Sequence, residues 1–274
     1  MASTPTVREI HSLDNPLIKE IRRARDRGEP LSRGEFAGTL ALDSPHLVEE
    51  AVKSGLVVEA LLFDAGVNAG VRETVERLPV GATRYKVSPA VYKKVASTES
   101  PQGLLALARP RQWVAHELFA PSPTLVVILA GIQDPGNAGT LLRTAEAFGA
   151  TGVMLLRGSV HETNPKLLRA AAGSTFRVPH LGGIQLDQAL AMCATQKTAI
   201  YALDPRAKTP LDRVDLRRPV ALAVGAEGTG LPPGLVDNAQ PVAIPRVRRV
   251  ESLNAAVAGA LALYEAARQR SSLG

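Results

Sequence analysis

The second half of this 274-residue chain alternates short, uncharged apolar runs with helical segments. Three such runs are 125–130, 152–156 and 220–224. Each is far shorter than the roughly 20 residues that a membrane-spanning helix needs. Strands that are apolar along their whole length are buried on both faces, which is typical of a parallel sheet covered by helices on each side. The pattern therefore predicts an α/β fold with a mostly parallel sheet.

The remaining elements fit the same organisation. Residues 5–108 also alternate helical and extended patterns, which predicts a separate small α/β domain. A proline-flanked stretch follows it, so the predicted division is a first domain at 1–108, a linker at 109–122 and a second domain at 123–274. In the second domain the predicted strands are 125–130, 152–156, 198–203, 220–224 and 241–244, and the predicted helices are 137–148, 165–172, 186–195, 233–238 and 252–270.

Composition restricts the class of protein further. The net charge is +6, of which residues 111–274 supply +5 (17 Lys and Arg against 12 Asp and Glu), as expected for a protein that binds a polyanion. No secretory signal or transmembrane helix is evident, so we expect a cytoplasmic protein without a membrane partner. Cys193, the single cysteine, lies in an apolar helical segment and is interpreted as a packing residue.

A first candidate site follows the strand at 125–130, where a Pro-Gly turn leads into a helix. Asn137 is predicted to cap this helix, because its side chain can accept hydrogen bonds from the amides of the first turn. Leu141, Ala145 and Phe148 form an apolar stripe, which leaves Arg143 on an exposed face. Ligands of open α/β sheets bind at the carboxyl ends of the strands. A capped surface helix with a solvated arginine is the alternative interpretation.

A second candidate site is a glycine-rich turn after the strand at 220–224. Gly225, Gly228 and Gly230 allow backbone to approach a ligand closely. Their spacing matches neither the dinucleotide-binding fingerprint nor a phosphate-binding loop, which argues against a nucleotide hydrolase. A bare glycine turn is the alternative.

The third candidate site is the run from Ile244 to Asn254, which leads into an alanine-rich helix. It holds three arginines and a Ser-x-Asn pair, and a helix N-cap role for Ser252 is the purely structural alternative to a functional site. The helix is predicted to present Leu253, Ala256, Val257, Ala260, Leu261 and Tyr264 as its apolar face.

Taken in order, the three segments resemble the signature of the SpoU/TrmH family of RNA ribose 2'-O-methyltransferases, within the SPOUT class. The first motif stands as Asn137, Arg143 and Ala-Glu-Ala-Phe-Gly at 145–149, and the second as Gly225, Glu227 and Gly230. The third stands as Ile-Pro at 244–245 and Ser-Leu-Asn at 252–254, and the helix predicted at 165–172 looks like the family's connecting helix. The first half, with Asn-Pro at 15–16 and Pro-His-Leu-Val-Glu-Glu-Ala at 45–51, is more loosely similar to L30e-like substrate-binding domains.

The resemblance implies a trefoil-knot (SPOUT) domain that binds S-adenosylmethionine, works without a metal and forms a homodimer in which each site borrows residues from its partner. It implies cofactor contacts from Leu203, Gly225, Glu227, Gly230, Ile244 and Leu253. Arg143 is the expected central catalytic residue, gripping a phosphate and stabilising the oxyanion. A guanidinium is permanently protonated and therefore a poor base, and the proton acceptor stays unassigned. Asn137, Glu227, Ser252 and Asn254 are expected to orient Arg143, the ribose and the knot loops.

One departure concerns the third motif. The family commonly has Met after the Ile-Pro and Gly two residues later, whereas this chain has Arg246 and Arg248. With Arg249 they form a basic loop that either contacts RNA phosphates or is simply solvated.

The leading hypothesis is an RNA 2'-O-methyltransferase that acts on ribosomal RNA, for housekeeping or for antibiotic resistance. Transfer RNA is the nearest rival substrate. A non-catalytic RNA-binding or ribosome-assembly protein on the same fold is a second hypothesis, and a nucleotide-dependent oxidoreductase is a third. The five catalytic candidates argue against the second, and the missing dinucleotide fingerprint argues against the third.

Overall fold

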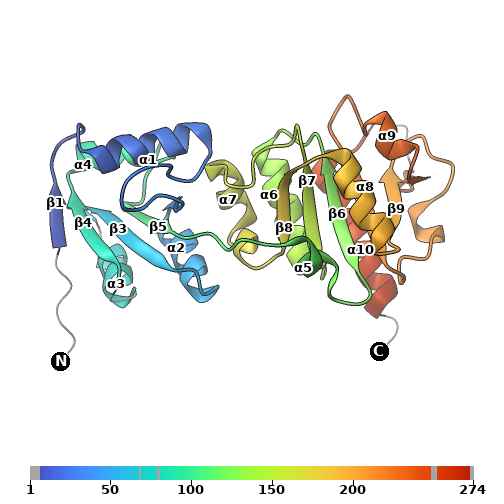
Figure 1. Cartoon of the computed structure of the whole chain (residues 1–274), viewed down its shortest axis with the longest axis horizontal. Coiled ribbons are helices and arrows are strands. Elements are labelled where there is room, and N and C mark those ends of the chain that lie inside the picture. The colour runs from blue at the N-terminus through green and yellow to red at the C-terminus, as the bar shows by residue number, and fades with distance from the viewer. Residues whose placement is uncertain (1–6, 68, 79–80, 248–251, 272–274) are drawn as a thin grey trace. The chain divides into compact units, whose positions relative to one another are not determined.

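A computed structural model describes residues 7–67, 69–78, 81–247 and 252–271 of the chain. The chain divides into two compact units, each with its own sheet (Figure 1). Unit 1 comprises residues 1–112 and 163–176, and unit 2 comprises 113–162 and 177–274. None of the helices in the described ranges combines the length and apolarity that a membrane crossing requires.

Unit 1 is built on a mixed five-stranded sheet in the order β1-β4-β3-β5-β2. The β1-β4 and β3-β4 pairs are parallel, and β5 runs antiparallel to β3 and β2. Its strands are β1 (Val7–Ile10), β2 (Leu40–Asp43), β3 (Val58–Asp64), β4 (Thr83–Val87) and β5 (Leu104–Ala108), and its helices are α1 (Pro16–Arg27), α2 (Pro45–Lys53), α3 (Ala69–Arg77), α4 (Pro89–Val95) and α7 (Pro165–Ala171).

Local sequence explains where the helices of unit 1 begin. Asn15, Ser44, Ser88 and Asn164 each accept a backbone N–H of the first turn and are each followed by proline, so α1, α2, α4 and α7 start with the same capped Pro. Helices α1 and α4 cover one face of the sheet, and α2 and α3 cover the other. Leu168 of α7 is buried in the core beneath α2 and α3.

Unit 2 is built on a six-stranded sheet in the order β11-β9-β10-β6-β7-β8, and every pair in it is parallel. This confirms the predicted α/β fold with a mostly parallel sheet. Its strands are β6 (Leu125–Ala130), β7 (Gly152–Leu156), β8 (His180–Ile184), β9 (Ala199–Leu203), β10 (Val220–Gly225) and β11 (Gln240–Val242), and its helices are α5 (Ala115–Phe119), α6 (Pro135–Ala147), α8 (Leu186–Thr195), α9 (Pro233–Val236) and α10 (Ala255–Ser271).

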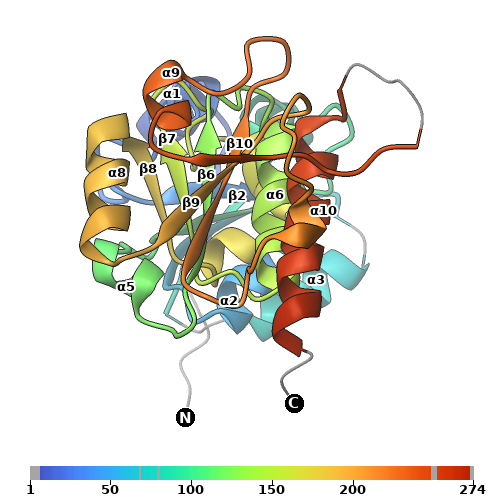
Figure 2. The ribbon, with the colours of Figure 1, turned by 90° about the vertical axis from the view of Figure 1, so that its right-hand side faces the viewer.

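The apolar strands of unit 2 divide their side chains between two layers. Val126 and Ile128 join the core that α5, α8 and α9 cover, where Cys193 is also buried as predicted. The opposite face packs on α6 and α10, which lie side by side (Figure 2). A Cβ at Gly259 of α10 would lie 2.3 Å from the Leu141 side chain of α6, so any larger residue there would displace Leu141.

Three elements differ from the sequence prediction. The segment expected as a linker contains α5, whose Leu118 and Phe119 are buried in unit 2. Strand β8 was not predicted, because its His-Leu-Gly-Gly-Ile sequence lacks an apolar run and is only half-buried at the sheet edge. Helix α7 was expected within the second domain, but the structure groups residues 163–176 with unit 1, since Leu168 and Phe176 belong to that core.

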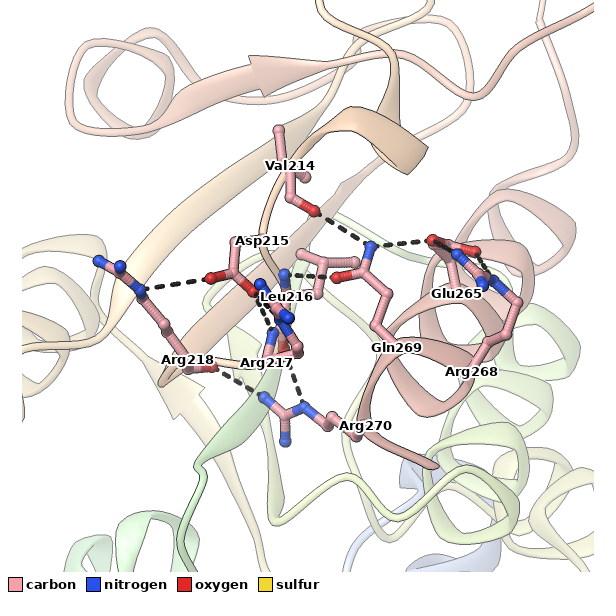
Figure 3. Close-up of polar contacts among 9 residues, drawn as sticks. All are labelled: Val214, Asp215, Leu216, Arg217, Arg218, Glu265, Arg268, Gln269 and Arg270. Atoms are coloured by element: carbon pink, nitrogen blue, oxygen red, sulfur yellow. Dashed lines mark hydrogen bonds and ion pairs between the residues drawn. The ribbon is translucent and has the colours of Figure 1, made fainter. Parts of the chain in front are cut away.

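The carboxyl-terminal end of α10 is fastened to the segments that precede the central strands β6 and β10, and Figure 3 shows its contacts with the segment before β10. The Arg270 guanidinium donates to the backbone oxygens of Pro123, Thr124, Leu216 and Arg218, at 2.7–3.0 Å. Gln269 bonds to the backbone at residues 214 and 216 as well. Burial lowers the pKa of Arg270. We call this cluster the α10 clamp.

Replacing Arg270 with alanine should lower the free energy of unfolding by about 2–3 kcal/mol, because it removes charge-assisted hydrogen bonds and leaves partly buried carbonyls unpaired. Urea unfolding followed by circular dichroism measures the loss. Arg268→Ala is the matched control, since Arg268 forms an ion pair with Glu265 on the same helix and is half exposed. That change should cost less than about 1 kcal/mol, and equal losses in the two variants would contradict the clamp's role.

Candidate active site

The predicted site residues converge at the carboxyl edge of the unit 2 sheet. Residue 137 lies in the first turn of α6, which follows β6, and residue 227 lies in the loop that follows the neighbouring strand β10. Residue 254 directly precedes α10, the helix that packs against α6. Parallel strands end at one edge of a sheet, so three segments far apart in the chain meet there.

Their side chains form a closed hydrogen-bond network. Asn137 Nδ2 donates to Glu227 Oε1 at 3.0 Å, and Asn254 Nδ2 donates to the same oxygen at 2.7 Å. Asn254 Nδ2 also donates to Asn137 Oδ1 at 3.1 Å, and the backbone N–H of Ala255 donates to Glu227 Oε1 at 3.3 Å. One carboxylate oxygen therefore holds the three motifs together.

The cap predicted for α6 was wrong, and so was the cap considered as an alternative for α10. Asp134, not Asn137, caps α6, since its side chain accepts the backbone N–H of Asn137 at 2.7 Å and the helix begins at Pro135. Asn254, not Ser252, caps α10, because its Oδ1 accepts the backbone N–H groups of the second and third helical residues. The caps free the Asn137 side chain for Glu227 and leave Ser252 exposed before the helix.

The glycine-rich turn is tightly closed. Ala226 and Gly230 exchange two backbone hydrogen bonds, at 2.9 and 3.2 Å, and Gly228 and Gly230 have positive φ angles. Gly225 passes directly beneath this closure, because a Cβ there would lie 2.5 Å from the carbonyl carbon of Gly230. The turn therefore requires glycine at its base as well as at its tip.

The other predicted cofactor residues lie near the ends of neighbouring strands. Leu203 ends β9, Gly225 ends β10, and Ile244 comes two residues after β11. These strands are adjacent in the order β11-β9-β10, and Leu253 precedes the cap of α10. The loops that follow β11, β9 and β10 therefore begin side by side at the carboxyl edge of the sheet.

The basic loop is only partly described. Arg246 donates to the backbone oxygen of Pro205 at 2.8 Å, so part of its guanidinium binds the loop that follows β9. Arg248 and Arg249 lie outside the described residues, and their predicted phosphate contacts stay predictions.

A cleft of about 810 Å³ opens beside the network. Of the predicted site residues, Asn137, Glu227 and Gly230 line it, whereas Arg143, Ser252, Asn254, Leu203, Gly225, Ile244 and Leu253 do not. Sequence analysis missed other lining residues, among them Asp134, Arg157, Gln185 and Leu231. The Asp-Pro at 134–135 could have been found as a helix start, but nothing in the sequence connects Arg157 or Gln185 with the motifs.

Arg143 lies apart from the network, on an exposed part of α6 as predicted. Its guanidinium has no hydrogen bond or ion pair within the part of the chain that the structure describes. It is thus available to a ligand or to another chain.

The predicted apolar face of α10 was partly wrong. Its buried residues are Ala255, Ala256, Gly259, Ala262, Leu263 and Ala266. Val257, Leu261 and Tyr264 are instead 47%, 42% and 53% exposed. The small residues fit the tight packing on α6, which turns the larger apolar side chains outward. Tyr264 packs edge-on against Phe148, the residue directly after α6, with ring centroids 5.8 Å apart.

The fold and the site together define an α/β protein with its ligand-binding edge at the carboxyl ends of parallel strands, where the three sequence motifs meet in one network. A family model described as the SpoU rRNA Methylase family matches residues 124–264, and a model of an MRM3-like substrate binding domain matches residues 15–106. The chain belongs to the SpoU methylase family, which confirms the resemblance inferred from the motifs.

Relatives and solved structures agree with this assignment. The chain is 36% identical to an uncharacterized tRNA/rRNA methyltransferase of Synechocystis sp., over 97% of this chain and 96% of the relative. It is 30% identical to the 23S rRNA (guanosine(2553)-2'-O)-methyltransferase RlmP of Bacillus subtilis, over 94% and 98% of the two chains. A crystal structure of an RNA 2'-O ribose methyltransferase superposes with a TM-score of 0.80 at 33% identity, covering 96% of this chain and 99% of the other.

Proposed function

We propose that this protein transfers a methyl group from S-adenosylmethionine to the 2'-hydroxyl of a ribose in ribosomal RNA. The observation that carries the proposal is the network of Asn137, Glu227 and Asn254, which joins one residue from each of the three motifs at the ligand-binding edge. A protein that only bound RNA would not need a carboxylate held by three donors beside a closed glycine turn at the sheet edge.

The residues around the turn fit the cofactor. Gly225 offers backbone without a side chain, and the loops after β9 and β11 begin beside it in the same sheet. Leu203, Gly225, Ile244 and Leu253 would hold S-adenosylmethionine chiefly through backbone groups. When bound, the cofactor supplies an electrophilic methyl group on a sulfonium centre. A solved structure of an rRNA methyltransferase from Sinorhizobium meliloti with bound AdoMet, 26% identical over 96% of this chain and 98% of that one (TM-score 0.80), supports this fit.

The chain's own residues have to orient the ribose and stabilise the negative charge that develops on its 2'-oxygen. The Arg143 guanidinium is suited to grip a neighbouring phosphate and to stabilise that oxygen, because it is a permanent cation with several N–H donors. Asn137, Glu227 and Asn254 fix the loops around the ribose, and Ser252 stands exposed next to them.

The homodimer is part of the same proposal. Arg143 does not line the cleft of its own chain, so a contribution to a second chain's site would explain its exposure. The exposed apolar stripe of α10, formed by Val257, Leu261 and Tyr264, lies on the helix that packs beside α6. An exposed apolar stripe on a surface helix suits an isologous two-fold interface, in which the same patch of each chain meets its copy.

Leu261→Arg should convert the dimer to a monomer, because it places a charge in the centre of the proposed interface. Light scattering coupled to size exclusion measures the mass, and methylation should fall together with dimerisation. Val236→Arg is the matched control, because Val236 is an apolar residue that is 40% exposed on α9. Leu190→Arg is unsuitable, since Leu190 packs against the core. A Leu261→Arg variant that remains dimeric would exclude this interface.

Unit 1 is proposed to bind the RNA substrate, in keeping with the substrate-binding model that matches it. Its α1 and α4 carry exposed cations, including Arg27, Lys93 and Lys94. Such side chains contact phosphates without reading sequence, so shape would guide recognition. Because the proposed substrate is ribosomal RNA, we propose that the protein acts in the cytoplasm.

Ribose methylation should be mapped in ribosomal and transfer RNA from cells with and without this protein. We expect one ribosomal 2'-O-methyl group to disappear when the protein is absent and to return in vitro when purified protein and S-adenosylmethionine are added. Loss of a transfer RNA methyl group instead would support the rival substrate. Unchanged maps, with no binding of S-adenosylmethionine by calorimetry, would overturn the proposed function.

A further inference from the structure

The cleft contains a basic residue that none of the three motifs includes. Arg157 follows β7 directly and is the one Lys or Arg among the described residues that line the cleft. Its side chain is exposed and makes no hydrogen bond or ion pair within the described ranges. A cation in the wall of a cleft beside an active-site network is available to an anionic group of a ligand.

The backbone that carries Arg157 is held on both sides. The Arg157 N–H donates to the Ile184 oxygen at 2.8 Å, which ties it to β8. Ser159 Oγ accepts the Gly131 N–H and donates to the Leu129 oxygen, both at 3.0 Å, and the Val160 N–H donates to the Ile132 oxygen at 2.8 Å. Between them Gly158 has a φ of +94°, which permits the turn.

This turn is therefore anchored to the loop that leads from β6 to Asn137 as well as to the sheet edge at β8. A guanidinium on such a fixed backbone loses less conformational freedom on binding than one on a mobile loop. The turn also carries Arg157 at the same edge of the sheet as the Asn137–Glu227–Asn254 network.

The rest of the cleft fits a nucleotide. Its volume of about 810 Å³ lies within the usual range for small-ligand pockets. Leu156, Leu186 and Leu231 offer apolar surface to a flat base, and the amides of Gln133 and Gln185 can hydrogen-bond to its edge. Enzymes that do chemistry on a base within a duplex take its nucleotide out of the stack into such a pocket, and this cleft could hold a nucleotide in the same way.

We propose that this cleft receives the target nucleotide of the RNA and that Arg157 binds a phosphate flanking it. The inference rests on the proposed function, since it assigns the substrate's place in the same active site. Arg157 acts here as a substrate-contacting residue that holds the nucleotide, while the 2'-hydroxyl lies toward the network that includes Asn137 and Glu227.

The test uses the full chain and a short transcript that spans the mapped methylation site. Arg157→Ala should raise the KM for this transcript about tenfold, as for the loss of a charge-assisted hydrogen bond, and leave kcat and the affinity for S-adenosylmethionine unchanged. The slope of log K against log salt for transcript binding should become shallower by about 0.7, the loss of one phosphate contact in single-stranded RNA. Arg157→Lys should recover most of the salt slope and part of the KM.

Lys197→Ala is the matched control, because Lys197 is an exposed cation two residues before β9, at the opposite edge of the sheet. It should leave KM and the salt slope unchanged. If Arg157→Ala behaves like Lys197→Ala in both measurements, the inference is wrong even though the enzyme is active. If the wild-type chain methylates no RNA, the proposed function fails and the place assigned to the nucleotide fails with it. If the enzyme is active but Arg157→Ala leaves the salt slope unchanged, only the Arg157 contact is refuted.

Discussion

Arg143→Ala should lower kcat for RNA methylation by about 10²–10³-fold, the range seen when one preorganised donor to a developing oxyanion is removed. Binding of S-adenosylmethionine should be unchanged, because Arg143 is exposed on α6 and lies outside the cofactor turn. The protein should also fold normally, since this side chain has no partner within the described residues. Single-turnover methylation and calorimetry measure the two effects separately.

Thr140→Ala is the matched control for this prediction. Thr140 is exposed on the same helix, three residues before Arg143. Its backbone oxygen accepts a hydrogen bond from the Thr144 hydroxyl, and the change to alanine preserves that oxygen. It should retain nearly full turnover. Near-normal turnover of Arg143→Ala would exclude Arg143 as the central catalytic residue, and a fall in cofactor affinity would assign it to a different part of the site.

Gly225→Val should abolish binding of S-adenosylmethionine and, with it, all methylation. Any Cβ at this position would lie 2.5 Å from the Gly230 carbonyl carbon and 2.7 Å from the Leu231 nitrogen. Both contacts are with backbone, so the turn itself has to move, and the two hydrogen bonds between Ala226 and Gly230 would be lost. Calorimetry with S-adenosylmethionine measures the binding.

The control for Gly225→Val is Gly81→Val in unit 1, where no atom lies within 4 Å of an added Cβ and the glycine has no positive φ. That variant should bind the cofactor like the wild type. Thermal unfolding should show Gly225→Val still folded, since the turn lies at the edge of the sheet and not in its core. Wild-type affinity in Gly225→Val would mean that the cofactor does not use this turn.

The fold of unit 2 could largely be predicted from sequence, because its central strands are buried on both faces and therefore consist of uninterrupted apolar runs. β6 was predicted to its exact residues, and β8 was missed because an edge strand with two glycines needs no apolar run. The membership of α7 in unit 1 could not be predicted either, since it depends on tertiary packing of Leu168 and Phe176.

The candidate site was predictable in its residue types but not in their local roles. Asn137 and Ser252 were both considered as caps, since either residue type can cap a helix, yet Asp134 and Asn254 occupy those positions. Helix propensity does not distinguish polar residues two or three positions apart. The contribution of Arg157 lay beyond sequence analysis because only the packing of β7 between β6 and β8 places it in the cleft.

The α10 clamp also bears on the order in which a newly made chain can become active. Residues 137 and 227 emerge from the ribosome well before residue 254, and the helix that residue 254 caps is held to the sheet by Arg270. A nascent chain that has not yet exposed Arg270 would therefore hold β6 and β10 with Glu227 bonded to Asn137 but without the donors that Asn254 and Ala255 supply. The network thus forms in full only after α10 has been synthesised and has docked on the sheet.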